Sequence, residues 1–145
     1  NISSPGETTI SVRASAEGHA PRLVSIRIRR VENLSTELPD ARIGAGTSYD
    51  DVASDPEAKR GTRVALEGSV LEERTENFAT VVLLDVKSGC NSPPCVAKVT
   101  YGAKAMVGSG DPVVAVGRVV GAVDGPRQNT KIPAIAAELV VKAAK

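Results

Sequence analysis

The residues of this chain that could do chemistry are few, and the most distinctive are two cysteines. Cys90 and Cys95 enclose Asn91-Ser92-Pro93-Pro94, so four residues separate the thiols. Such a pair could form a redox couple, half of a metal site or a structural disulfide. The spacing is not that of a CxxC motif, no second cysteine pair follows, and the only histidine is distant. Because the Pro-Pro segment indicates a tight reversal, we predict a disulfide across an exposed loop, formed in an oxidising compartment.

The remaining reactive side chains do not predict an enzyme. His19 is the single imidazole and lies in a polar turn, which is typical of a solvated loop. The glutamates of residues 72–76 are mixed with Arg74 at an expected strand end. The aspartates of residues 50–55 lack the alternating oxygen ligands of a calcium loop, and helix capping explains two of them. We therefore expect no catalytic residue, no metal and no cofactor.

Charge and aromatic content argue against nucleic acid as the main ligand. The 145 residues include 18 Lys and Arg against 17 Asp and Glu. From Gly61 to Lys145 the chain holds ten basic and eight acidic residues, with Phe78 and Tyr101 as its aromatics. Single-strand binding needs a basic groove and stacking platforms, so we expect it to be weak at most. No apolar run approaches the roughly 18 residues of a membrane span.

The elements that must position these residues begin with two alternating segments. Thr8–Ala14 and Arg22–Val31 each alternate apolar and polar residues around a turn at residues 17–21, which predicts a β-hairpin with one apolar face. An isolated hairpin is marginal in water, so this one needs a partner surface. Residues 32–47 show no periodicity and carry Pro39, Gly44 and Gly46, which indicates a linker.

A helix and five strands are expected after the linker. Ser48 is a good helix N-cap with Asp51 in capping-box position, Pro56 marks a break or a second helical piece, and Gly61 marks the stop. The glycines at 117 and 121 suggest bends or bulges in the fourth strand, and residues 102–110 could hold one helical turn. The expected strands are Arg63–Glu72, Phe78–Val86, Cys95–Tyr101, Pro112–Val123 and Ile132–Val141.

Three segments between residues 48 and 142 form an ordered set of motifs: Asp55-Pro56 followed by Gly61-Thr62-Arg63-Val64-Ala65-Leu66-Glu67-Gly68-Ser69-Val70, then 110–121, then 132–140. In their order and spacing these segments resemble the tRNA-anticodon-binding-like OB-fold domains of bacterial envelope proteins. In that family a helix with an aspartate-proline step leads into a first strand of pattern G-x-x-V-x-x-x-G-x-V. The resemblance implies a five-stranded OB-type barrel.

Within residues 5–31, Gly6–Ala14 carries alternating Ile10, Val12 and Ala14 after a glycine, and Leu23–Arg30 ends in basic residues. This order resembles the last two strands of a bacterial immunoglobulin-like domain, in which the pattern G-x-N-x-I-x-V-x-A precedes a closing strand that ends in basic residues. Glu7-Thr8 departs from that pattern in part. The resemblance implies that the rest of a sandwich lies outside this chain.

These observations give one set of expectations. The fold is all-β: a hairpin over residues 1–31, a linker over 32–47, and a helix plus OB-type barrel over 48–145. The function is binding or scaffolding, without catalysis, in an extracytoplasmic bacterial assembly in the periplasm, in the cell envelope or secreted; weak single-strand binding is the alternative. A protein partner, or an upstream part of the same polypeptide, completes the hairpin sheet, and a homo-oligomer is left open. The candidate binding residues combine the disulfide loop with the surface where OB barrels present ligands: Phe78, Cys90, Asn91, Cys95, Lys98 and Tyr101.

Overall fold

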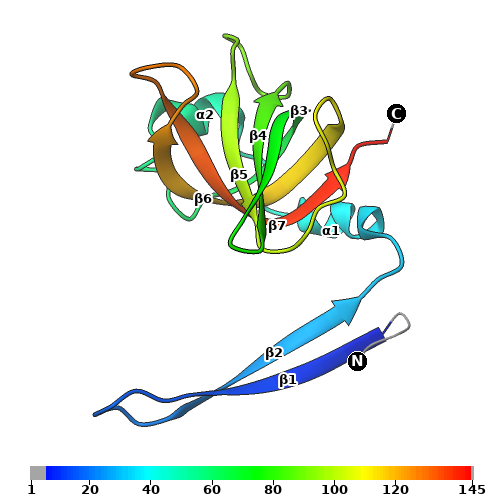
Figure 1. Cartoon of the computed structure of the whole chain (residues 1–145), viewed down its shortest axis with the longest axis vertical. Coiled ribbons are helices and arrows are strands. Elements are labelled where there is room, and N and C mark those ends of the chain that lie inside the picture. Colours follow the sequence, from blue (N-terminus) through cyan, green and yellow to red (C-terminus); the bar gives the residue numbers. More distant parts are fainter. Residues whose placement is uncertain (1–5, 145) are drawn as a thin grey trace. The chain divides into compact units, whose positions relative to one another are not determined.

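The computed structural model describes residues 6–144, which fall into two compact units divided after Leu34. The first unit is a hairpin of β1 (Gly6–Ala14) and β2 (Arg22–Arg30), paired antiparallel (Figure 1). Ile10 is paired with Ile26 and Val12 with Val24. Since paired residues share a face, the predicted apolar face is confirmed, and Arg13, Arg27 and Arg29 lie on the opposite face. Residues 1–5 of the predicted first segment lie outside the described residues.

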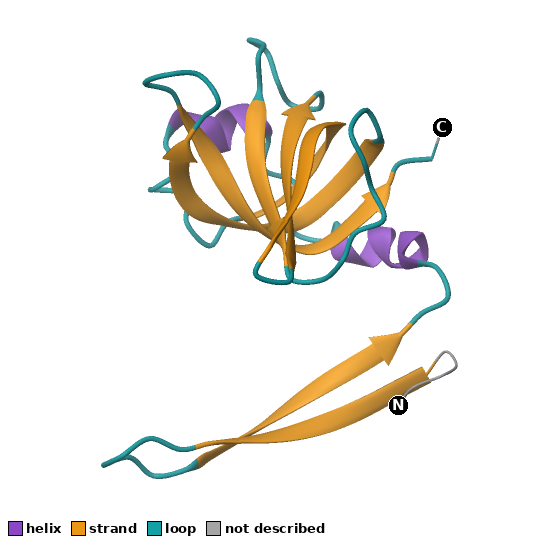
Figure 2. Cartoon of the chain, viewed as in Figure 1, coloured by secondary structure: helices purple, strands orange, loops and turns teal. Residues whose placement is uncertain are grey.

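The second unit is a closed barrel of five strands with short helices before it (Figure 2). The strand order around the barrel is β3-β4-β5-β7-β6, and only β5 and β7 run parallel. This closed, partly parallel barrel of five strands, together with the separate hairpin and the short helix α2, confirms the expected all-β fold class. The strands are β3 (Arg63–Glu76), β4 (Ala79–Val86), β5 (Val96–Tyr101), β6 (Pro112–Asp124) and β7 (Lys131–Lys142).

Aliphatic side chains fill the barrel. The most deeply buried are valines and leucines from every strand, together with Val52 of α2 (Tyr49–Ser54). Val52 and Tyr49 thereby join the helix to the barrel core. The buried set includes Val64, Leu66, Val70, Val82, Leu84, Val86, Val99, Val113 and Ile135.

Glycines allow the strands to cross closely where the barrel bends. A Cβ on Gly68 would lie 2.1 Å from the Asp85 carbonyl oxygen, and one on Gly117 would lie 2.2 Å from that of Ala136. The β6–β7 register shifts at Val116/Gly117 and at Val119/Gly121, which confirms the bulges expected at both glycines. No other residue type fits Gly68 or Gly117 without separating two backbones.

The segment predicted to be an irregular linker contains two short helices instead. These are η1 (Leu34–Glu37) and α1 (Leu38–Ala41). Leu38, Ala41 and Ala45 pack on a second apolar cluster formed by Val114, Val116, Leu139 and Val141. This contact could not be predicted from the sequence, because one leucine and two alanines do not form a periodic apolar pattern. The surface that they cover is formed by barrel strands much later in the chain.

The next helix, α2, ends at Ser54, before the stop that the sequence predicts at Gly61. Ser48 caps it as predicted, since its Oγ accepts from Asp51 N at 3.3 Å and donates to the Asp51 carboxylate at 2.8 Å. It ends at Ser54 because Pro56 excludes the residue before it from helical geometry. Asp55 then accepts from Ala58 N at 3.0 Å and begins a separate turn.

Residues 102–110 form bends and a turn, and not the expected helical turn. The buried Thr80 hydroxyl donates to the Ala103 carbonyl at 2.8 Å and accepts from Ala105 N at 3.0 Å. The Ala103 carbonyl and the Ala105 N–H are thus bonded to β4 and cannot bond within a helical turn, so the segment stays non-helical.

Candidate binding sites

The disulfide loop between β4 and β5 is bonded as predicted and fastened to α2. Cys90 and Cys95 are joined with their Cα atoms 6.1 Å apart. Asp50 accepts from Asn91 N through its carboxylate at 2.9 Å, and its own N–H donates to the Gly89 carbonyl at 3.1 Å. The loop is thus held by α2 at Gly89 and Asn91 and closed by the disulfide from Cys90 to Cys95, just before β5, which makes it a pre-organised surface.

A cavity of about 530 Å³ opens beside this loop. Its apolar lining includes Val96 and Ile132, while Arg127 and Asp85 add charge of both signs. Binding sites for small molecules are usually concave and largely apolar, with a few polar groups, and this cavity has that form. Its lining residues are Tyr49, Leu71, Asp85, Pro94, Val96, Pro126, Arg127, Thr130, Lys131 and Ile132.

The tyrosine of this cavity is a structural group. The Tyr49 hydroxyl donates to the Val96 carbonyl at 3.0 Å, and burial raises the pKa of the phenol above its ordinary value. It therefore remains a protonated donor at neutral pH and ties α2 to the start of β5. Sequence reasoning missed the cavity because its walls come from α2, four strands and two loops that no local pattern connects.

The remaining predicted binding residues do not form one surface. Lys98 alternates with core residues Ala97 and Val99, so it faces outward from β5. Tyr101 shares the inward face and packs partly buried against the core. Phe78 lies in the β3–β4 turn, separated from the disulfide loop by the eight residues of β4, or about 26 Å.

Phe78 occupies an unusual backbone position. It is 95% exposed, and both Asn77 (φ 48°) and Phe78 (φ 66°) have positive φ in a two-residue turn. Asparagine suits the first position of such a turn and glycine the second. A bulky residue at positive φ is strained, so the Phe78 ring is displayed at an energetic cost.

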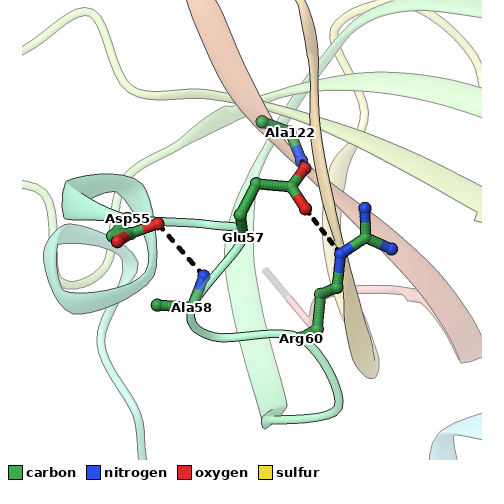
Figure 3. A network of polar contacts seen from close by, with 5 residues as sticks. All are labelled: Asp55, Glu57, Ala58, Arg60 and Ala122. Carbon is green, nitrogen blue, oxygen red and sulfur yellow. Dashed lines mark hydrogen bonds and ion pairs between the residues drawn. The ribbon is translucent and has the colours of Figure 1, made fainter.

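A carboxylate clasp holds the barrel end near α2 (Figure 3). Glu57 accepts from Arg60 Nε and from Ala122 N, the latter at 2.8 Å, and thus fastens the post-helix turn to the β6 bulge. The Arg60 hydrogen bond, followed by that of Ala122, holds the pKa of Glu57 below its ordinary value. A Cβ at Gly121 would come within 2.6 Å of Glu57 Oε1, so the bulge and the clasp depend on each other.

The hairpin exposes its apolar face. Ile10, Val12, Val24, Ile26 and Ile28 are each 40–50% exposed. On the opposite face Arg27 pairs with Glu7 at 2.9 Å. The exposed face is continuous because the register sets these side chains opposite one another in cross-strand pairs.

Within residues 6–144, no group of three or more His, Cys, Asp or Glu side chains lies close enough to hold a metal ion. His19 lies in the β1–β2 turn, where its Nδ1 is 3.1 Å from the Glu17 carbonyl oxygen. No helix in the described part of the chain is long and apolar enough to cross a membrane.

No protein-family model matches the chain, and no curated protein matches its sequence.

Proposed function

We propose that this chain is a non-enzymatic binding or scaffolding module of an extracytoplasmic bacterial assembly. The hairpin is its protein-docking element, and strands from a partner, or from an upstream part of the same polypeptide, cover the apolar face. The barrel and its preceding helices form a separate folded unit that follows the hairpin in the chain.

The observation that carries this proposal is the exposed apolar face of the hairpin. Completing the burial of five half-exposed aliphatic side chains is worth roughly 4–7 kcal/mol in total, taking about half of the full burial energy for each. A two-stranded sheet is marginal alone, so covering this face is also what would stabilise the hairpin itself. The arginines on the opposite face keep that side in water.

The disulfide supports the extracytoplasmic assignment. The Cys90–Cys95 ring spans only five residue steps, so it adds little to stability through chain entropy. Its contribution is to fix the loop beside the cavity, and such bonds persist mainly in oxidising compartments. A fixed loop beside a partly apolar cavity gives the barrel a second surface for a partner.

Weak single-strand binding is the alternative function. The outward Lys98 and the cavity residues Arg127 and Lys131 favour it. The orientation of Tyr101 disfavours it, because the ring packs partly buried against the core and so offers a base less surface for stacking. Lys131 is also paired with Asp124, which reduces the net attraction for phosphate.

Site-specific photo-crosslinking tests the proposed function. A photoreactive residue replaces Ile26 on the apolar face and, as the matched control, Ser25 on the opposite face, in the producing cell. We expect discrete protein adducts, or an internal crosslink to upstream strands, from position 26 and far fewer from position 25. Equal yields at the two positions, or no adduct at 26, would contradict the proposal.

A further inference from the structure

The β3–β4 hairpin ends in a projecting segment, Leu71–Ala79, which we call the finger. The pairing of β3 with β6 stops at Ser69. The β3–β4 register then shifts at Leu71, and from Glu72 to Glu76 β3 pairs with β4 alone among the described strands. All residues from 71 to 78 are exposed, and the strained Phe78 forms the tip. Strain that displays an aromatic ring to solvent is a reason to look for a ligand of that ring.

The finger surrounds its aromatic tip with negative charge. It contains three glutamates and one arginine, a net charge of −2. Arg74 bridges Glu72 at 3.5 Å and Glu76 at 2.7 Å, while Glu73 lies on the other side of the strand. Phosphate backbones and anionic lipids are repelled by such a surface, so the finger suits an apolar surface flanked by basic side chains.

The N-terminal hairpin has this chemistry. Residues 6–34 carry five arginines and three glutamates, a net charge of +2. Arg30 is paired with Gly6, and Arg22 with Ala14, so both arginines lie on the same face as Ile10 and Ile26. The apolar face is therefore bordered by an arginine at each end, and either arginine complements a finger whose carboxylates precede its aromatic tip on β3.

We propose that the finger of one copy docks on the apolar hairpin face of a second copy. This inference rests on the proposed function, because it takes the same hairpin face as a docking surface and names its occupant. Phe78 inserts between the aliphatic side chains, and the glutamates of β3 approach the arginine at one end of the face, Arg22 or Arg30. Docking of two hairpins face to face is disfavoured, because both carry a net positive charge.

The size of the surface sets the strength of the contact. Nine residues at 3.3 Å each and two strands 4.8 Å apart give a face of about 30 by 10 Å, or roughly 300 Å². A stable interface needs about 800 Å² per partner, so one contact is weak and dependent on concentration and salt. The finger and the hairpin face are different surfaces. Two copies can therefore bind each other reciprocally, each finger on the other's hairpin, or many copies can associate head to tail.

Sedimentation of the full chain tests this proposal. We expect self-association between about 5 and 500 µM, weakening as salt rises. Phe78→Gly should weaken it at least tenfold, as loss of an anchoring aromatic does. Ile43→Ser, which removes another exposed apolar side chain (72% exposed), should leave it unchanged.

A charge exchange identifies the two surfaces. Glu72→Lys with Glu73→Lys should abolish association, as should Arg22→Glu with Arg30→Glu, and mixing the two variants should restore it. Crosslinks between ¹⁵N-labelled and unlabelled copies should join the finger to the hairpin. A chain that stays monomeric throughout, or association unaffected by Phe78→Gly, would overturn the inference. Adducts at position 26 with a different protein would then still support the proposed function.

Discussion

Replacing Phe78 by glycine should make the barrel unit more stable, although it removes the only phenylalanine. An L-residue in the left-handed region costs about 1–2 kcal/mol, and glycine avoids this cost. Glycine also gives the unfolded chain more freedom, which cancels about 0.5–1 kcal/mol. The ring is 95% exposed, so its loss removes almost no buried area. The free energy of unfolding should therefore rise by about 0.5–1 kcal/mol.

Thermal and urea unfolding of the full chain measure this change. For a unit of this size the gain corresponds to an increase in Tm of about 2–4 °C. Phe78→Ala is the matched control, because it removes the ring but keeps the Cβ that makes positive φ costly. The reasoning fails if Phe78→Gly melts at or below the wild type, or if Phe78→Ala gains as much.

Three further predictions concern the barrel and its loops. Gly68→Ala should lower the free energy of unfolding by about 3 kcal/mol or more in urea titration, since its Cβ would contact Asp85 backbone atoms; a loss under about 1 kcal/mol would contradict the close crossing. Glu57→Gln should lower Tm at neutral pH. Because the pKa of Glu57 is lowered in the folded state, the ionised clasp contributes fully above about pH 4.3 and is lost as pH falls through the folded-state value, so the Tm difference should close in acid. A difference that widens below pH 4 would refute the clasp. Cys90→Ser with Cys95→Ser should cost about 2 kcal/mol or less and speed amide exchange in residues 89–95, whereas two free thiols in unreduced wild type would exclude the bond.

The barrel could be predicted from sequence because its strands alternate and its glycines mark the bends. Val64, Leu66 and Val70 follow the period of a strand with one buried face, and the register bears this out. The bulges at Gly117 and Gly121 could also be predicted, because a glycine within a valine-rich strand indicates a bulge or a close approach of another backbone.

The candidate site was less predictable because distant segments build it. Tyr101 was expected on a ligand surface. Alternate residues of β5 share a face, and because Ala97 and Val99 lie in the core, Tyr101 lies on the same inward face. Leu38, Ala41 and Ala45 gave no helical signal because the barrel face that they cover comes from strands 70 to 100 residues later. The strain at Phe78 has no sequence signature apart from an asparagine before it.

Amide hydrogen exchange across Thr8–Ala14 and Arg22–Ile28 tests the central claim most directly. It compares the dilute chain with the chain in the proposed assembly. The account predicts fast exchange in these strands when the chain is dilute, slow exchange in the barrel strands, and strong protection of the hairpin in the assembly. A dilute monomer whose hairpin is already as protected as the barrel would contradict the claim that this face awaits a partner.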